Sequence, residues 1–440
     1  MYRDAAPGEH VLYDVVGDRY IGVDGALLEA IGRWGNGGQV LDKEREAHQA
    51  LCGAGLLVAD DAADDTRLAG HWRRSSEGMP DTLYVTLMPT LACNLACTYC
   101  FQKDHPATGR MSAETEAAAQ AYVLQRVDSS GTGRLLVHYI GGEPLTRKDL
   151  LLRTAAVFSR AMAERGGTFA WELTTNGIGL APAFVDALLA FGEGTVKLTL
   201  DGDRETHDAG RVYRSGQGTF DQVFDALVAV ARSCPGVKVR VGGNFLPGQA
   251  DSYERLLRRM EDAGLRGLLE ETIFKPVMDV GSAHGCSGCA APQAEAETLV
   301  QIGRSAQRRG LGRRATGQVD RAGLCEVHWA NSTVIDPMGR LYKCLDVAGR
   351  PEMAIGDVWK GETRGDPLTE ARPWERHEPC RTCAYLPVCG GGCIGGRFLQ
   401  TGRTGEVLCR LDHFQQSFRE EIVARYLAEF HGGNEKKRAA

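Results

Sequence analysis

The sequence predicts an α/β protein built around an open, partial (β/α)6 barrel. Over residues 80–285, short apolar segments of strand character alternate with helical segments, which is the pattern of βαβ units in a parallel sheet. The first 65 residues carry hairpin and helix patterns of their own. From about residue 320 the chain becomes rich in Gly and Cys with few long apolar runs, which predicts a small domain held by metal rather than by an apolar core.

Residues 1–65 are predicted to form a small N-terminal domain. VLYDVV and RYIGV flank a Gly-Asp turn, LLEAIGRW and EREAHQALCGAG have helical spacing, and LLVAD predicts a final short strand. This order resembles the winged-helix-like domain that binds leader peptides in ribosomal-peptide pathways. The resemblance implies leader recognition, and a structural extension packed on the barrel is the alternative. The polar stretch over residues 60–78 is predicted to be a linker.

Six strands are predicted in the barrel, and helical patterns such as SAETEAAAQAYVLQRV and AFVDALLAFG lie between them. The strands are TLYVTLM, RLLVHYI, FAWELTT, VKLTL, VKVRVGGNF and LEETIF. In a barrel of such units the strand C-termini form the active face. Residues 286–319 are expected to bridge to a cysteine-rich domain over 320–415, and residues 416–440 are expected to form a C-terminal helix and a disordered tail.

Composition excludes several classes of protein. The net charge of -6 is modest and no Lys/Arg stripe stands out, so neither nucleic acid nor membrane is an expected partner. The N-terminus has no apolar run of signal-peptide length, which predicts a cytoplasmic protein. Fourteen cysteines in such a chain indicate metal ligation rather than a disulfide framework. Cys52 and Cys234 lie outside any motif and are expected to be buried thiols.

Three cysteines follow the first barrel strand. CNLACTYCF places Cys93, Cys97 and Cys100 in a Cys-x3-Cys-x2-Cys loop, whose thiolates can hold one cluster and leave a fourth iron open for substrate. This loop resembles that of the radical S-adenosylmethionine (SAM) superfamily, in which an aromatic residue, here Tyr99, precedes the third cysteine. The resemblance implies a [4Fe–4S] cluster that binds SAM and cleaves it to a 5′-deoxyadenosyl radical. Structural zinc is the alternative, and the loop lacks a nearby fourth ligand for it.

The segment after the second strand also resembles that family. Gly141, Gly142 and Glu143 match its GGE segment, which takes the methionine ammonium group of SAM. The two glycines allow a close backbone approach, and the carboxylate can accept hydrogen bonds from a cation.

The ends of the third and fourth strands add weaker candidates. Thr174, Asn176 and Asp201 resemble family positions near the ribose and the radical-generating face. Taken alone, each is explained equally well by a turn or a loop start. Arg211 is a candidate for binding a carboxylate of the cofactor or of a substrate, with a solvated loop arginine as the alternative.

A second set of cysteines comprises Cys325, Cys344, the run Cys380-x2-Cys383-x5-Cys389-x3-Cys393, and Cys409. This spacing resembles the SPASM extension, which holds auxiliary four-iron clusters in radical enzymes acting on peptides and proteins. The resemblance assigns four cysteines to a distal cluster: Cys380, Cys383, Cys389 and Cys409. It assigns three to a nearer cluster: Cys325, Cys344 and Cys393. The missing fourth ligand is a substrate thiolate or a cysteine of the pair Cys286 and Cys289, unless that pair does something else. A zinc ribbon is the alternative for these CxxC patterns.

Together the resemblances imply a radical SAM enzyme with three [4Fe–4S] clusters that modifies a ribosomally made precursor peptide, forming a thioether or carbon-linked cross-link. The implied partners are the precursor with its leader and a flavodoxin- or ferredoxin-type electron donor. An anaerobic sulfatase-maturing, formylglycine-generating enzyme is the first alternative. In that group of enzymes, the proposed base is an aspartate directly after the second extension cysteine. This chain has Leu345 at that position, and Asp346, one residue later, is the candidate catalytic base. A non-catalytic zinc-binding interaction protein is the alternative of another class.

Overall fold

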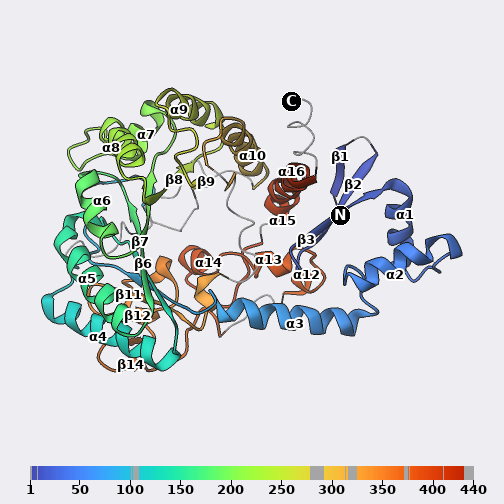
Figure 1. Ribbon diagram of the computed structural model, residues 1–440, viewed down its shortest axis with the longest axis horizontal. Coiled ribbons are helices and arrows are strands. Elements are labelled where there is room, and N and C mark those ends of the chain that lie inside the picture. The colour runs from blue at the N-terminus through green and yellow to red at the C-terminus, as the bar shows by residue number, and fades with distance from the viewer. Residues whose placement is uncertain are drawn as a thin grey trace.

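The computed structural model describes most of the chain, and its strands form two sheets (Figure 1). The described residues are 2–6, 8–100, 102, 109–277, 292–312, 314–315, 325–370, 375, 377–409 and 411–430. One sheet has three strands and belongs to the N-terminus, and the other has eleven.

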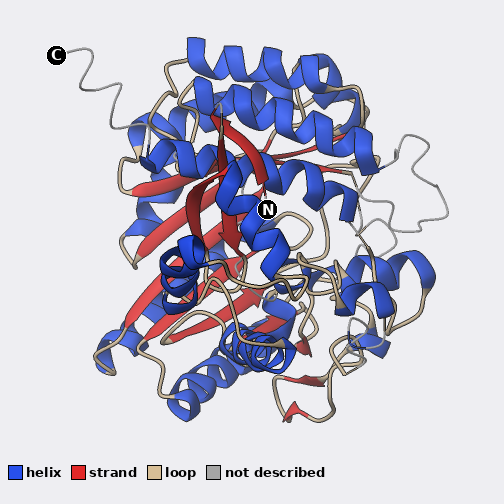
Figure 2. Cartoon of the chain, turned by 90° about the vertical axis from the view of Figure 1, so that its right-hand side faces the viewer, coloured by secondary structure: helices blue, strands red, loops and turns tan. Residues whose placement is uncertain are grey.

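The larger sheet contains the six predicted barrel strands, all parallel and in the order β9-β8-β7-β6-β5-β4. They are β4 (Thr82–Leu87), β5 (Arg134–Tyr139), β6 (Thr168–Thr175), β7 (Glu193–Thr199), β8 (Val237–Phe245) and β9 (Glu271–Pro276). The two end strands of this series pair with other neighbours, β10 (Arg314–Ala315) and β11 (Ser332–Ile335), instead of with each other. The predicted open α/β barrel is therefore confirmed, and Figure 2 shows its strands as a curved sheet.

Helices cover the outer face of this sheet and alternate with its strands. They are α4 (Ala113–Ser130), α5 (Lys148–Glu164), α6 (Pro182–Leu189), α7 (Arg204–Gly210), α8 (Phe220–Ser233), α9 (Ala250–Asp262) and α10 (Pro292–Arg308). The boundaries of α4 follow from its sequence, because the Ser112 side chain accepts a hydrogen bond from Thr115 N and Gly131 ends the helix in the left-handed conformation.

The two faces of the barrel sheet differ in polarity because successive side chains of a strand point to opposite faces. The residues toward the helices are apolar and buried, for example Val85, Val137, Leu198 and Val241. The alternate residues on the concave face are polar and only partly buried: Tyr84, His138, Glu172, Thr174, Lys197, Arg240 and Asn244. The concave face thus offers hydrogen-bonding and charged groups instead of an apolar layer.

The C-terminal region joins the barrel instead of standing apart. β11 pairs with β4 in parallel, and β12 (Arg340–Tyr342), β13 (Gly356–Asp357) and β14 (Gly361–Glu362) continue the sheet. An apolar cluster includes Met88 and Leu91 of the barrel segment and Val334, Tyr342 and Leu368 of the C-terminal region. The prediction that metal alone, without an apolar core, holds this region is therefore wrong for its first half.

The N-terminal sheet consists of β1 (Tyr2–Ala6), β2 (Glu9–Asp14) and β3 (Arg19–Asp24), followed by α1 (Gly25–Trp34) and α2 (Arg45–Gly53). The predicted hairpin and both helices are confirmed. The predicted strand LLVAD is wrong, because that segment bends and does not pair.

The predicted linker over residues 60–78 is a helix, α3 (Asp61–Glu77), so this prediction is also wrong. The Asp60 side chain caps its first turn by accepting from Ala63 N. His71 is buried and hydrogen-bonds the Pro387 carbonyl at 2.9 Å. The Asp60 cap and the His71–Pro387 hydrogen bond, which spans 316 residues of sequence, stabilise this polar helix. Its composition alone is typical of a linker.

The last described helix, α16 (Arg419–Phe430), packs on the N-terminal sheet, so the two ends of the described chain lie side by side (Figure 1). Ile422 and Tyr426 are buried with Val11 in one cluster. The Tyr426 hydroxyl donates to Glu9 Oε1 at 2.5 Å. Residues 431–440, expected to be a tail, lie outside the described residues.

Cys234 is buried as expected, but Cys52 is exposed on α2, so the prediction of a buried thiol there is wrong. In the described part of the chain, the helices are too short or too polar to cross a membrane.

Candidate active site

The loop that follows β4 carries Cys93, Cys97 and Cys100, and backbone hydrogen bonds hold it against the segment after α7. Ala96 N donates to the Val212 carbonyl at 2.8 Å. Thr98 N donates to the Gly210 carbonyl at 3.0 Å. All three thiols are partly buried. The loop is therefore fixed at the C-terminal end of the sheet by a segment more than 100 residues away.

The other side of the cysteine loop lies against the Gly141–Glu143 segment. Gly142 N donates to the Thr90 carbonyl at 2.9 Å, and Glu143 N donates to the Ala92 carbonyl at 3.0 Å. A Cβ at Gly141 would meet Thr90 O at 2.3 Å, and one at Gly142 would meet Ala92 O at 2.2 Å. Both glycines are required for this approach of the chain to its own backbone, beside the position where a ligand of the loop would bind.

Glu143 is buried, and its carboxylate accepts hydrogen bonds from groups near the ends of two strands. Its Oε1 accepts from Leu145 N at 2.9 Å and from the Thr175 hydroxyl at 2.7 Å. Its Oε2 accepts from Asn176 N at 2.8 Å. Burial raises the pKa of Glu143, and these hydrogen bonds oppose that shift. The carboxylate thus joins the end of β5 to the end of β6, a role that the sequence did not indicate.

Asn176 reaches the cysteine loop, whereas Thr174 does not. The Asn176 amide donates to Asn94 Oδ1 at 2.8 Å, and its nitrogen lies 3.8 Å from Cys93 Sγ. Thr174 Oγ1 instead lies 2.9 Å from His138 Nε2 on the concave face. The structure therefore groups Asn176 with the cysteines and Thr174 with the barrel interior.

Tyr99 connects the cysteine loop to the end of β7. Its hydroxyl donates to the Asp201 carboxylate and accepts from Arg211 Nη1 at 2.8 Å. Asn244 N donates to Asp201 Oδ1 at 2.7 Å. Burial raises the pKa of Asp201, and the Arg211 guanidinium lowers it. Arg211 is only 7% exposed, so the alternative of a solvated loop arginine is wrong.

A series of hydrogen bonds that runs through His207 and Thr219 holds the backbone carbonyl of Arg211. Asp201 N donates to His207 Nδ1 at 3.2 Å, which leaves the imidazole proton on Nε2, 3.1 Å from Thr219 Oγ1. The Thr219 hydroxyl donates in turn to the Arg211 carbonyl at 2.7 Å. His207 is thus a site residue that sequence reasoning missed, and its only sequence signal is its position shortly after Asp201. Arg211 was a sequence candidate, and the structure places it in the site as the partner of Tyr99.

The three cysteines expected at the nearer cluster gather beside Asp346. Cys393 Sγ lies 3.8 Å from Asp346 Oδ2. Burial raises the pKa of Cys344, and the charges of Asp346, Cys393 and Cys325 raise it further. Gly395 makes room for this grouping, because a Cβ there would lie 2.6 Å from Cys344 Sγ.

The cysteines expected at the distal cluster form a separate group. Burial raises the pKa of Cys380, and the nearby Cys383 and Cys409 thiols raise it further. Burial also raises the pKa of Cys389 to about 11, with Cys383 and Cys380 contributing. Cys286 and Cys289 lie outside the described residues. Among the residues that are described, no three His, Cys, Asp or Glu side chains converge on the position of a single metal ion.

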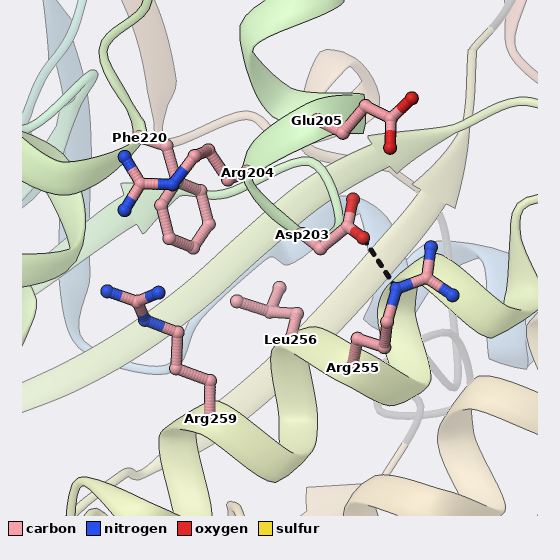
Figure 3. A pocket seen from close by; sticks show the side chains of 7 residues that line it. All are labelled: Asp203, Arg204, Glu205, Phe220, Arg255, Leu256 and Arg259. Carbon is pink, nitrogen blue, oxygen red and sulfur yellow. Dashed lines mark hydrogen bonds and ion pairs between the residues drawn. The ribbon is translucent and has the colours of Figure 1, made fainter.

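A surface pocket of about 380 Å³ lies apart from these groups, between α7, the start of α8 and α9 (Figure 3). Three arginines line it, but Arg255 pairs with Asp203 at 2.6 Å and Arg204 pairs with Asp221. Arg259 lies over the Phe220 ring. The pocket contains none of the candidate site residues.

The family model described as the radical SAM superfamily matches residues 87–260. A pre-heme d1 synthase of Dinoroseobacter shibae is 25% identical over 354 residues, which cover 72% of this chain and 83% of that protein. A PqqA peptide cyclase of Ruegeria pomeroyi is 25% identical over 320 residues, which cover 69% of this chain and 80% of that protein.

Two solved structures share the fold. The structure of anSMEcpe with bound S-adenosylmethionine (AdoMet) and the Cp18Cys peptide has a TM-score of 0.62 and 19% identity, and covers 80% of this chain and 99% of that one. Streptococcus suis SuiB bound to the precursor peptide SuiA has a TM-score of 0.55 and 14% identity, and covers 92% of this chain and 96% of that one. At these identities the likeness establishes the fold.

A radical SAM domain implies SAM and a [4Fe–4S] cluster as cofactors, and the residues present fit them. Three partly buried thiols share one loop, and Leu95 N donates to Cys93 Sγ at 3.4 Å. The guanidinium of Arg211 lies close enough to counter the effect of burial on the Cys97 thiol, whose pKa burial raises. Residues 87–260 of this chain thus form a domain that matches the radical SAM superfamily.

Proposed function

We propose that this protein modifies a ribosomally made precursor peptide by radical hydrogen abstraction. The observation that carries the proposal is the position of the cysteine loop, fixed between the Gly141–Glu143 segment and residues 210–213 above a polar concave face. Peptide substrates are supported by the relatives named PqqA peptide cyclase and mycofactocin maturase. Two structures with this fold hold a peptide or a precursor peptide.

In the proposed site, Cys93, Cys97 and Cys100 hold the radical SAM cluster. When bound, this cluster with SAM supplies the 5′-deoxyadenosyl radical that abstracts a hydrogen atom. Gly141, Gly142 and Glu143 bind the methionine ammonium group of SAM.

Five further residues complete the proposed SAM site. Tyr99 and Asp201, joined by a hydrogen bond, shape the side near the ribose, and Asn176 orients the loop through Asn94. Arg211 offsets the negative charge that thiolate ligands bring to a buried loop. Thr174 acts from the concave face, beside His138.

We propose that the N-terminal sheet recognises the leader of the precursor. β3 lies at an edge of the three-stranded sheet, and among the described strands its outer side has no partner. An edge strand can pair with an extended peptide through main-chain hydrogen bonds. Leader binding at residues 1–65 and modification at the barrel would then be separate steps on one chain.

We further propose two auxiliary [4Fe–4S] clusters, which gives three in total. Cys380, Cys383, Cys389 and Cys409 would hold the distal cluster. Cys325, Cys344 and Cys393 would hold the nearer one, with Cys286, Cys289 or a substrate thiolate as the fourth ligand. A flavodoxin- or ferredoxin-type protein would supply electrons, and the reducing cytoplasm is the proposed compartment because the ligands are thiolates.

The proposed product is a cross-link, either a thioether or a carbon-linked bond. Oxidation of a Ser or Cys side chain to formylglycine is the second candidate. The position of Asp346 favours formylglycine formation, because its carboxylate would act as the base. Its Oδ2 lies 3.8 Å from Cys393 Sγ, at the nearer cysteine group. A hydrazide probe separates the two, because formylglycine carries an aldehyde and a cross-link does not.

The first test is anaerobic reconstitution with iron and sulfide, followed by metal analysis and measurement of 5′-deoxyadenosine release from SAM under dithionite. We expect about twelve irons and nucleoside release, and about four fewer irons with no release when Cys93, Cys97 and Cys100 are replaced by Ala. Bound zinc without nucleoside release would contradict the proposal and indicate a binding protein.

A further inference from the structure

The distal cysteine segment, residues 380–389, packs against the N-terminal domain. It carries three of the four cysteines assigned to the distal cluster. Tyr385 of this segment and Val11 of β2 are buried in one apolar cluster, and Cys383 packs against that cluster. A cysteine expected to hold iron therefore lies beside the sheet that is proposed to recognise the leader.

Aromatic rings make the connection between the segment and the sheet. The Tyr385 ring meets the Phe418 ring edge-on, with the centroids 5.9 Å apart. The Phe418 ring in turn meets the Tyr13 ring of β2 edge-on, with the centroids 5.6 Å apart. Edge-to-face pairs are a favoured geometry of aromatic side chains and add to the free energy of burial. The distal cysteine segment is therefore joined to β2 through three packed rings.

Helix α3 makes a second connection between the same two parts. Arg67 forms an ion pair with Asp14 of β2. Four residues later, His71 hydrogen-bonds the Pro387 carbonyl at 2.9 Å. Because residues four apart lie on the same side of a helix, one side of α3 contacts both the sheet and the distal cysteine segment. Figure 1 shows α3 passing alongside α13 (Leu386–Cys389).

Trp72, the next residue of α3, lies against the cysteines themselves. Cys380 and Leu386 are buried in an apolar cluster, and Trp72, Cys383 and Val407 pack against it. Solvent exposure is one of the factors that set the properties of an iron–sulfur cluster. The half-buried indole of Trp72 thus shields the distal cysteines from water on the side of α3.

The local structure of the distal cysteine segment is too short to hold this arrangement by itself. Its helices, α12 (Glu378–Arg381) and α13, have four residues each, and helices of that length are unstable without partners. Metal bound by thiolates fixes chain segments of this kind, and its binding free energy becomes folding free energy. Metal at the distal cysteines would therefore fix the surface on which β2 and α3 pack.

We propose that the distal cluster supports leader recognition, because iron held there fixes the N-terminal domain on the barrel. Trp72 and Tyr385 couple the two sites. The inference rests on the proposed function, which assigns leader recognition to residues 1–65 and iron to the distal cysteines. Coupling between two sites is reciprocal. Iron should therefore order the N-terminal sheet, and the contacts of that domain should retain the iron.

The first test measures hydrogen exchange in three proteins that are reconstituted anaerobically with iron and sulfide. They are the wild type, the distal variant Cys380→Ser/Cys383→Ser and the matched control Cys325→Ser/Cys344→Ser, which removes two cysteines of the nearer group instead. Amides of β2 should exchange about tenfold faster in the distal variant and at the wild-type rate in the control. Amides of β4 should remain protected in all three, which shows that the barrel is folded.

The second test measures the reverse direction of the coupling, with Trp72→Ala. Release of iron to a chelator is followed by absorbance, and the distal fraction, about a third of the iron, is identified as the part that is absent from the distal variant. This fraction should be lost about tenfold faster from Trp72→Ala. Trp72→Phe should restore slow release, and Trp359→Ala, at an exposed tryptophan of the C-terminal region, should behave as the wild type.

Two results would overturn the inference. One is exchange in β2 that is equally fast in the distal variant and in the control. The other is release of the distal iron at the same rate from Trp72→Ala and Trp359→Ala. Neither measurement requires radical chemistry, so a failure of the proposed function is distinguishable. Coupling without modification of any peptide would keep the support role and refute the maturase, and peptide modification without coupling would do the reverse.

Discussion

The Tyr99 hydroxyl connects the cysteine loop to two buried charged residues of the site. Its hydroxyl lies between Asp201 and Arg211, whose charged atoms are 3.9 Å apart, and it hydrogen-bonds both. All of these groups are withdrawn from water, so a missing hydrogen bond is not replaced by solvent. The cysteine loop is therefore coupled to the end of β7 through one side chain.

Tyr99→Phe should lower the free energy of unfolding by about 1–3 kcal/mol, because the buried Asp201 and Arg211 each lose a hydrogen-bond partner. It should also slow 5′-deoxyadenosine release, since the loop loses its link to β7. Denaturant titration and chromatography measure the two effects. Tyr213→Phe is the control, because that hydroxyl contacts Gln222 at the surface; equal losses in both variants would contradict the coupling.

His207 should make stability depend on pH. Burial lowers the pKa of His207 from its usual 6.5 to about 3, so the folded protein keeps the ring neutral while the unfolded chain protonates it. The contribution of the neutral ring is complete above pH 6.5 and is lost as the pH falls toward 3, at roughly 1.4 kcal/mol for each unit of pKa difference.

The measurement is urea unfolding of the iron-free protein at several pH values between 7 and 4. Wild type should lose stability over this range more steeply than His207→Gln. His48→Gln, a change on α2, should follow the wild-type curve. Parallel curves for wild type and His207→Gln would mean that another group determines the pH dependence.

At the scale of elements, the packing of α16 on the N-terminal sheet brings together the two ends of the described part of the chain. Ile422 is fully buried in the cluster that contains Val11. Ile422→Ala should therefore cost about 2–5 kcal/mol and increase hydrogen exchange in β2, without changing SAM cleavage in the absence of peptide. Val423→Ala, at a half-buried neighbour, should have a smaller effect. Unchanged exchange in β2 would show that α16 does not stabilise the sheet.

The elements also differ in how far their sequence specifies them. The six barrel strands carry apolar residues at alternate positions, and both the pattern and its spacing are local. α3 was predicted to be a linker because residues 60–78 are polar, and the partners that stabilise it, such as Pro387 for His71, are distant in sequence. β11 was missed because STVI has only four residues and gains its stability by pairing with β4.

At the scale of the whole molecule, the barrel and the first half of the C-terminal region share a sheet and an apolar cluster, while the distal cysteine group lies farther along the chain, within residues 380–409. Removal of iron should therefore affect the two parts of the C-terminal region differently. In iron-free protein, amides of β11 should keep their protection against hydrogen exchange, because Met88, Val334 and Tyr342 remain packed.

In the same exchange experiment, residues 380–409 should lose protection on iron removal, because they contribute few members to that cluster and carry the distal cysteines. Mass spectrometry of the iron-loaded and iron-free proteins gives both results. Loss of protection in β11 as well would show that metal holds the entire region.

The barrel strands, the cysteine loop and the Gly141–Glu143 segment could be predicted from the sequence, because a strand pattern and a contiguous motif are properties of neighbouring residues. Which distant side chains complete the site depends on tertiary packing. Arg211 is a buried partner of Tyr99, and Glu143 links the ends of β5 and β6. Such roles depend on the order of strands and on burial, which arise only when segments far apart in the chain pack together.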